Sequence, residues 1–507
     1  ISPIQRVHRL PGEECIMAFG EDLPVLDIDK ITASMDRASQ LGATYADVRV
    51  EAVEQEGASA ENGIIKTLAA ATGTSVGVRA LAGGGWGFAS FNVPDASQLG
   101  NSLEEAVGRA VAQAKATARF GEVRLAPVDP VVAEIPLDIG KEPWDLEGKQ
   151  EEIVAITKDM KALEGIALAT GTLKHKLTDH VFATTEGARI IERGVITEGS
   201  YYVHAVGPGG AQGIWRPFGV VGGLDLLVGD NDPRGVGMRI AKRAVELTTD
   251  AEAPSDGKTT VITTPEFDQL LVHEIVGHPT EADRVLGGES AWAGRAWWSN
   301  KAGDEIGTEL VNVVSDARPI DRHAGGFGTF HYDHEGVPAQ RVHHIVRGRL
   351  SEFLHSRQSA AEMMVEPNGA MRAITASKVP IVRMTNTYFE ANPQGPSTLE
   401  ECIEDVKDGI ILGESSIPSI DSVRLRWQIN AYDGWRVKNG EIVGSLKNLA
   451  FLGNTPEYFQ TIRVVGNEKT WKLLPIPNCG KGDPMQIQRI GNGGPVMVGE
   501  GNIVGVA

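Results

Sequence analysis

Two histidines and a glutamate stand close together in residues 273–278, in the pattern H-E-x-x-x-H. Imidazole nitrogens are common zinc ligands, and a carboxylate beside a ligand can act as a general base on a water molecule. The better-known zinc helix has its histidines four residues apart, on one face. His273 and His278 are five apart, which places their rings about 140° apart on a regular helix. A shared ion therefore requires a local change in helix geometry.

Two routes would bring the rings together. A π-type turn, which is common at functional sites, would align His278 with His273. Alternatively, Gly277 could leave the helical conformation while Pro279 pushes His278 out of it, so that His278 folds back from the first non-helical residue. The pattern also fits two unrelated histidines at the end of a half-buried helix.

A catalytic zinc site needs a third protein ligand, and Cys479 is the best candidate. It lies in a stretch rich in proline and glycine, residues 475–484, which predicts a surface loop. Lys481 favours the thiolate, which is the form that binds metal. The other interpretation of Cys479 is an incidental small residue. Cys402 lies in an apparent amphipathic helix and is interpreted as a core residue, and Cys15 as incidental.

Local patterns predict the elements that must position these residues. A strand over residues 259–263 precedes a helix over residues 265–278, and most segments after about residue 305 have strand patterns. Asn439 and Gly440 predict a hairpin turn. Helical patterns earlier in the chain, separated by strand patterns, cover residues 28–38, 103–114, 147–163 and 234–248.

These patterns predict an α+β protein. Two N-terminal α+β units precede a β-rich C-terminal domain that carries one metal-binding helix. The main boundary follows from the linker composition of residues 250–257. The predicted divisions are an N-terminal extension over 1–24, α+β units over 25–120 and 121–250, and the β-rich domain with the metal-binding helix over 258–507.

The order and spacing of several motifs resemble the TldD/PmbA family over nearly the whole chain. These motifs are the histidine pattern, the acidic pair Glu281 and Asp283, residues 332–336, Asn386 and residues 478–481. Because the PmbA-like branch lacks the histidine motif, the chain resembles the metal-bearing, TldD-like branch. The resemblance implies a zinc peptidase with one Zn²⁺ per metal-bearing subunit. Its ligands would be His273, His278 and Cys479, and its general base Glu274.

The resemblance also implies a dimer, formed with an identical chain or with a PmbA-like subunit, that encloses the site and admits extended peptides. Tyr332 and His334 lie at a predicted strand end beside the active-site cleft, and with Asn386 they are the candidates for substrate binding. A second metal site in residues 330–335 is the other interpretation of this segment. Pro279 stands where the family commonly has glycine, which affects the expected loop geometry.

Charge and composition limit the function classes. Lys and Arg number 48 and Asp and Glu 67, so the net charge is −19, which disfavours nucleic-acid binding and anionic membrane surfaces. No apolar run is long enough to span a membrane. The odd number of cysteines, three, favours a reducing cytoplasm over a disulfide framework.

The favoured function is a zinc-dependent peptidase that hydrolyses unfolded or short peptides with little sequence specificity, with Glu274 as the general base on a zinc-bound water. A β-rich domain supports this, because sheet edges bind extended peptides through their main chain. The alternative is a non-catalytic or regulatory partner protein, of the gyrase-modulator type, that keeps a metal site. A fourth protein ligand on the metal would favour that alternative.

Overall fold

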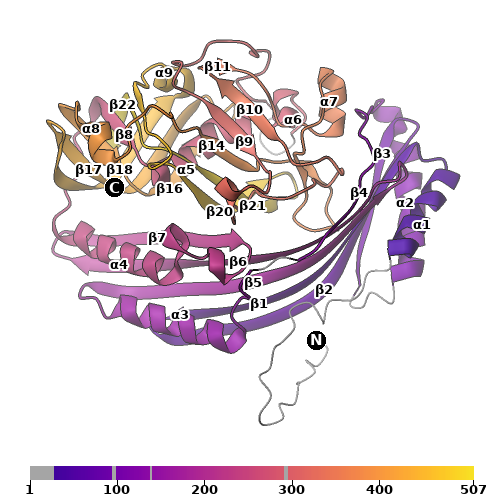
Figure 1. The fold of residues 1–507 in the computed structure, drawn as a ribbon, viewed down its shortest axis with the longest axis horizontal. Helices are drawn as coiled ribbons and strands as arrows, with labels where there is room; N and C mark the ends of the chain where they lie inside the picture. Colours follow the sequence, from indigo (N-terminus) through magenta and orange to yellow (C-terminus); the bar gives the residue numbers. More distant parts are fainter. Residues whose placement is uncertain (1–27, 94–98, 138–139, 290–294, 507) are drawn as a thin grey trace, which may run out of the picture.

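The computed structural model describes residues 28–93, 99–137, 140–289 and 295–506, and they form a mixed α+β fold (Figure 1). The strand-rich character of its C-terminal part confirms the predicted fold class. The chain passes from an N-terminal region to a C-terminal region between Thr249 and Gly257. The predicted N-terminal extension over 1–24 and Cys15 lie outside the described residues.

One long, curved sheet of seven strands forms the N-terminal region (Figure 1). Its order is β3-β2-β1-β5-β6-β4, with β7 paired to β6, and all pairs are antiparallel except β4–β6. The strands are β1 (Tyr45–Glu61), β2 (Ile64–Ala82), β3 (Gly85–Val93), β4 (Val132–Ile135), β5 (Ile166–Thr184), β6 (Arg189–Gly207) and β7 (Gly210–Val221). Because β1 pairs with β5 along its length, the sheet continues across the division predicted at residues 120 and 121.

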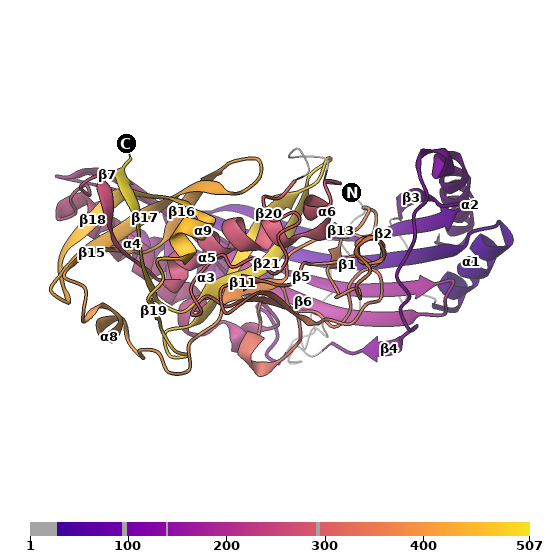
Figure 2. The same cartoon turned by 90° about the horizontal axis from the view of Figure 1, so that it is seen from above.

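Two helix pairs cover this sheet at its two ends. They are α1 (Ile28–Gln40) with α2 (Leu99–Thr117), and α3 (Leu146–Lys161) with α4 (Pro233–Thr249). Each pair has its own hydrophobic cluster against the strands, and both clusters cross the predicted division, since Val181 of β5 packs in the first and Ala58 of β1 in the second. The C-terminal region lies over the concave face, and Figure 2 shows the long strands running beneath it toward α1 and α2.

Two larger sheets build the C-terminal region, together with a two-stranded one. The six-stranded sheet has the order β11-β10-β9-β14-β21-β20, and the seven-stranded sheet β15-β8-β22-β18-β17-β16 with β19 paired to β22. The strands of the first are β9 (Val313–Asp316), β10 (Arg341–Val346), β11 (Arg349–Leu350), β14 (Asn386–Phe389), β20 (Lys472–Lys481) and β21 (Gln486–Gly494). Those of the second are β8 (Gly257–Thr263), β15 (Asp408–Leu412), β16 (Ser415–Ile420), β17 (Arg426–Lys438), β18 (Glu441–Asn454), β19 (Val464–Val465) and β22 (Met497–Gly505). The two-stranded sheet consists of β12 (Met371–Arg372) and β13 (Ile381–Val382).

The helices of this region are short. They are α5 (Pro265–Val272), α6 (Ala282–Val285), α7 (Arg357–Met363), α8 (Leu399–Ile403) and α9 (Thr455–Phe459). Cys402 is buried on α8, which confirms its interpretation as a core residue, and burial raises its pKa to about 11. The predicted turn is also confirmed: Asn439 and Gly440 join β17 to β18 with φ of 49° and 79°, the left-handed values of a tight hairpin turn.

Helix α5 lies between the two larger C-terminal sheets and contacts strands of both. The predicted core face is Phe267, Leu270, Leu271 and Ile275. Three of these residues are fully buried in the largest hydrophobic cluster, whereas Leu270 is only partly buried and packs against it. This burial from both sides fixes the helix, and with it the histidine motif, on a rigid scaffold. Among the described residues, no helix combines the length and apolar character needed to cross a bilayer.

Candidate metal centre

The histidine motif lies on a π-type turn at the end of α5. Residues 273–277 form this turn, and the backbone N–H of His278 donates to the carbonyl of His273, five residues back. The longer turn brings the two rings to a centroid distance of 4.7 Å, nearly perpendicular to each other. The first of the two predicted routes is therefore confirmed.

The second route, in which Gly277 and His278 leave the helix, is wrong. Both keep helical dihedral angles, with φ of −55° at Gly277 and −63° at His278. The glycine serves close packing instead, because a Cβ atom there would lie 1.9 Å from Met384 Sδ.

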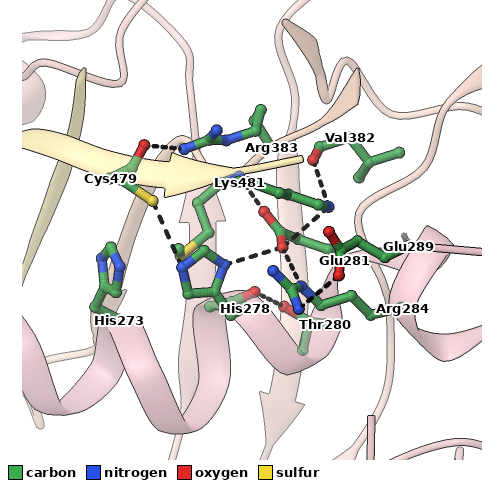
Figure 3. Close-up of polar contacts among 12 residues, drawn as sticks. His273, His278, Thr280, Glu281, Arg284, Glu289, Val382, Arg383, Cys479 and Lys481 are labelled. Carbon is green, nitrogen blue, oxygen red and sulfur yellow. Dashed lines mark hydrogen bonds and ion pairs between the residues drawn. The ribbon is translucent and has the colours of Figure 1, made fainter. Parts of the chain in front are cut away.

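Cys479 joins the two histidines from β20, the edge strand of the six-stranded sheet (Figure 3). Ligand atoms of all three residues lie within 4.8 Å of one another, and all three side chains are buried. The predicted surface loop is wrong: Cys479 is in a strand and only 3% exposed. Prolines are tolerated at a sheet edge, where an N–H group need not pair.

The outer nitrogen of each ring has a partner that sets its orientation. His273 Nδ1 donates to Asn492 Oδ1 at 3.1 Å, because the Asn492 amide nitrogen is used toward the Thr387 carbonyl. His278 Nδ1 donates to Glu281 at 3.0 Å (Figure 3). Both Nε2 atoms therefore face the pocket, which is the usual arrangement of metal-binding histidines.

Glu281 is in turn held by two cations. Its carboxylate accepts from Arg284 Nε at 3.0 Å and lies 3.1 Å from Lys481 Nζ (Figure 3). Burial acts to raise the pKa of Glu281, but Lys481 and His278 lower it well below its usual value. An ionised Glu281 therefore fixes the His278 tautomer. Lys481, which was expected to favour the thiolate, contacts this carboxylate instead.

This donor set fits zinc. Two imidazole nitrogens and a thiolate are zinc ligands by type, and a tetrahedral ion with bonds of about 2.0 and 2.3 Å separates nitrogen from sulfur by about 3.5 Å. The observed distance from His278 Nε2 to Cys479 Sγ is 3.5 Å. The described residues bring three protein ligands to the pocket, which matches an open, catalytic type of site rather than a closed one.

Electrostatics favour the thiolate. Burial acts to raise the pKa of the Cys479 thiol, but Arg383 and the two histidines lower it well below its usual range. Arg383 also donates to the Cys479 carbonyl at 2.6 Å. Burial acts to lower the pKa of His273, but the neighbouring sulfur more than offsets this and raises that pKa to about 8. The pocket is thus built to hold a positive charge beside the sulfur.

Glu274 lies next to the three ligands without joining them. Its Oε1 is 3.9 Å from His273 Nε2, and its Oε2 forms an ion pair with Arg424. Burial acts to raise the pKa of Glu274, but Arg424 and the histidines lower it below its ordinary value. The carboxylate is therefore ionised at neutral pH and can accept a proton.

The centre opens into a cleft of about 350 Å³ between two sheet edges. One wall is the edge strand β20 with Pro475, Ile476 and Pro477, and the other is the edge strand β16 with Ser415 and Pro418. The N-terminal sheet adds Trp215 of β7. The cleft thus combines a charged floor with walls formed by two edge strands.

The three predicted substrate-binding residues are not among those that line this cleft. His334 stacks on His180 of β5 with ring centroids 5.1 Å apart, and Tyr332 packs partly against the cluster around Phe182. Asn386 is fully buried and ties a loop by accepting from the Gly328 N–H at 2.9 Å. The same segment contacts the N-terminal sheet through His331 with Glu192 and Glu335 with Arg79, so it joins the two regions of the protein.

Asn492 and Arg424 contribute to the site without having been predicted. Neither carries a local signal: Asn492 lies in a glycine-rich strand and Arg424 in a short loop, 219 and 150 residues from the side chains that they contact. Glu281 was noted only as one of an acidic pair. Its spacing of three residues from His278 could have indicated the contact, because such residues are neighbours on a helical turn.

Comparison with known proteins identifies the domains. Residues 256–502 match the PmbA/TldA metallopeptidase C-terminal domain, and residues 46–114 match PmbA/TldA metallopeptidase domain 1. A protein named metalloprotease from Methanothermobacter thermautotrophicus is 29% identical to this chain, and the match covers 89% of this chain and 93% of the length of that protein. A zinc metalloprotease TldD homolog from Saccharolobus solfataricus is 32% identical over 48% of this chain and 50% of its own.

Solved structures share the fold. A putative modulator of a DNA gyrase from Thermotoga maritima has a TM-score of 0.72 and 16% identity, covering 94% of this chain and 99% of its own. TldE from Thermococcus kodakarensis has a TM-score of 0.68 and 15% identity, covering 94% and 100%. The domain matches point to a family whose domains are named for metallopeptidases, and the solved structures show the same mixed α+β fold. The chain belongs to the TldD/PmbA family, as the order of its motifs indicated.

Proposed function

We propose that the protein is a zinc-dependent peptidase that hydrolyses unfolded or short peptides with little sequence specificity. The observation that carries the proposal is the convergence of His273, His278 and Cys479 to within 4.8 Å, with the ionised Glu274 beside them at the base of an open cleft. Relatives named metalloproteases support the same class.

The residues of this chain have separable roles in that reaction. A zinc ion held by His273, His278 and Cys479 would supply an activated water and polarise the scissile carbonyl. Glu274 Oε1 accepts a proton from the attacking water and passes it to the nitrogen of the leaving amine, so that the C–N bond breaks without expelling an amide anion. Asn492 and Glu281 keep the two imidazoles in the orientation that this requires.

The walls of the cleft support the proposed substrate class. Because β20 and β16 are both edge strands, an extended chain between them can be bound through its backbone rather than through side chains. Such binding accepts many sequences. It also excludes folded proteins, whose backbone groups are already paired and whose bulk cannot enter a cleft of about 350 Å³.

The alternative, a regulatory protein that keeps a metal site, retains one supporting observation. Two solved structures of similar fold are named as putative modulators of DNA gyrase. A structural zinc site is normally closed by four protein ligands. Detection of a fourth side chain on the bound metal, together with absent hydrolysis, would favour this alternative.

We also propose a dimer that works in the cytoplasm. A reducing medium keeps Cys479 available for metal. The dimer surface that we propose is the edge of β2 over residues 64–73, which among the described residues pairs with β1 alone, since the described part of β3 pairs with β2 only from Thr74 onward. This segment is exposed on both faces, including Ile64 at 65% and Leu68 at 45%. A strand edge of this length that no described segment covers is a ready template for a second copy of the chain.

The deciding experiment combines metal analysis with hydrolysis. Wild-type protein purified without chelator should contain about one zinc ion per chain. His273→Ala should lose this zinc, whereas the control His343→Ala, on β10 away from the cleft, should keep it. The zinc-loaded protein should cut a denatured protein at several unrelated positions and leave its folded form intact. A wild-type protein without a transition metal, or one that cuts the folded form at a single motif, would contradict the proposal.

A further inference from the structure

The two carboxylate oxygens of Glu274 have different surroundings. Oε1 lies 3.9 Å from His273 Nε2, the nitrogen that faces the metal pocket. Oε2 accepts a hydrogen bond from a guanidinium nitrogen of Arg424. Arg424 also lines the cleft. One oxygen is thus anchored and the other is directed toward the site of reaction.

Arg424 is itself held in place by an ordered loop, residues 421–425, between β16 and β17. Its φ is 63°, a left-handed value that is uncommon and costly for a residue other than glycine. The Asp421 carboxylate accepts from the backbone N–H of Leu425 at 2.8 Å, and Trp297 N donates to the Val423 carbonyl at 2.9 Å. These contacts maintain the unusual backbone and fix the direction in which the guanidinium leaves the loop.

Arg424 contacts the active site through its guanidinium, which donates to Glu274 Oε2. Its side chain is only 13% exposed, so the pair with Glu274 is shielded from solvent. Of the charges that favour the ionised form of Glu274, Arg424 is the strongest. A glutamate has three side-chain torsions, and without an anchor on Oε2 its carboxylate can rotate away from the metal pocket.

We propose that Arg424 is a positioning residue for Glu274: it anchors Oε2 so that Oε1 faces the metal pocket. The inference rests on the proposed peptidase function. Because the loop of Arg424 continues directly from β16, the strand that forms one wall of the cleft, substrate bound along that wall lies next to the element that orients the base. Positioning of this kind acts on the chemical step, since a displacement of about 1 Å can cost about 100-fold in rate.

The kinetic test compares Arg424→Gln and Arg424→Lys with Arg426→Gln, an exposed arginine just beyond the same loop. We expect Arg424→Gln to lower kcat by about 10- to 100-fold with KM changed by less than about 3-fold and zinc content unchanged. Arg424→Lys should recover part of this loss, and Arg426→Gln should behave as wild type. An unchanged kcat, or a loss confined to KM, would overturn the proposal.

Crystal structures of the wild type and of Arg424→Gln provide a readout that does not depend on activity. Glu274 Oε1 should face His273 Nε2 in the wild type and should have rotated away in the variant. An unmoved carboxylate in Arg424→Gln would overturn the positioning role. A wild type that binds zinc but hydrolyses nothing would sink the proposed function alone, and the two structures would still decide the role of Arg424. If Arg424→Gln does not fold, Arg424→Met, which keeps the aliphatic stem, is measured by the same criteria.

Discussion

The two histidines reach the pocket from the turn at the end of α5, and Cys479 reaches it from the edge strand β20. Each of these three residues makes a further contact that holds it in place. His273 donates a hydrogen bond to Asn492 and His278 donates one to Glu281, while Arg383 donates to the carbonyl of Cys479. The ligands themselves could be predicted, because zinc chemistry restricts residue type and spacing. Asn492 and Arg383 could not, because they lie 219 and 96 residues along the chain from the side chain and the carbonyl that they contact, and such contacts leave no local pattern.

Replacing Glu274 by glutamine tests the proton transfer. The amide is nearly isosteric but cannot accept a proton, so Glu274→Gln should keep zinc and fold and lose about 10²- to 10⁴-fold in kcat on an unstructured peptide. Steady-state kinetics with metal analysis of the same sample checks this. Hydrolysis at the wild-type rate would mean that another group is the base.

The two described cysteines provide a matched pair for the metal. Cys479→Ser should weaken zinc binding and shift any activity toward harder metals, because it replaces the soft thiolate of the site. Cys402→Ser should leave metal binding unchanged, since Cys402 is buried on α8 away from the pocket. Competition with a chromogenic chelator measures both affinities. Equal zinc retention in the two variants would remove Cys479 from the ligand set.

At the scale of elements, α5 and its π-type turn determine the geometry. The bounds of α3 and α4 lie within two residues of those predicted, because amphipathic periodicity and caps are local signals. The π-type turn was one of two routes open from the sequence. In this turn Gly277 packs against Met384, from a segment more than 100 residues away, and no local pattern indicates that contact.

Enlarging Gly277 tests this contact. Gly277→Ala would place a Cβ atom 1.9 Å from Met384 Sδ, so the variant should be destabilised by about 1–3 kcal/mol and bind zinc more weakly. Shortening the opposing side chain, in Gly277→Ala with Met384→Ala, should restore zinc binding in part. Gly108→Ala on α2, where a new Cβ meets no atom within 4 Å, is the control. Urea unfolding and zinc titration measure stability and zinc affinity. A Gly277→Ala variant as stable as the wild type, with the same zinc affinity, would contradict the packing argument.

Asp268 on α5 predicts a pH dependence of stability. Its carboxyl group is fully buried, and neither oxygen has a hydrogen-bond partner of good geometry among the described residues. Burial raises the pKa of Asp268 well above its usual value, and Thr263 only partly offsets this. The folded state therefore keeps a proton that the unfolded state loses above about pH 4, so this group makes the protein less stable as pH rises from there.

Asp268→Asn removes this titration while keeping the shape. The free energy of unfolding at pH 7 should rise, and the gain should shrink toward pH 4. Urea denaturation at pH 4.5 and 7.5 measures it, with Asp36→Asn on the exposed face of α1 as control. A gain that is equal at both pH values would show that the charge of Asp268 is not the cause.

At the scale of the whole molecule, long-range strand pairing decides the arrangement. The ranges predicted as units, 25–120 and 121–250, each contain one helix pair, but the hydrophobic cluster of each pair includes strand residues from the other range. Their shared sheet depends on the pairing of β1 with β5, for example Val50 with Val181. Such pairing follows from packing across more than 100 residues, so periodicity within one segment does not predict it.

The uncovered edge of β2 predicts self-association. Ile64→Lys with Leu68→Lys would bring like charges together across a two-fold axis, so the variant should weaken dimerisation by at least about 10-fold. Val443→Lys, at a similarly exposed position on β18, should leave the assembly unchanged. Analytical ultracentrifugation compares the three proteins. A wild type that stays monomeric throughout, or a double variant that dimerises as well as the wild type, would contradict this surface.

The distance along the chain between the ligands has a consequence for synthesis. Cys479 follows His278 by 201 residues, and β22, which pairs with β8 beside α5, is made later still. At 5–20 residues per second a ribosome needs about 10–40 s to add that length. Throughout this interval the emerging polypeptide holds both imidazoles but lacks the sulfur. A hydrolase of broad specificity would thus be unable to attack its own unfinished chain, the unfolded peptide nearest to it, until translation of the β20 segment is complete.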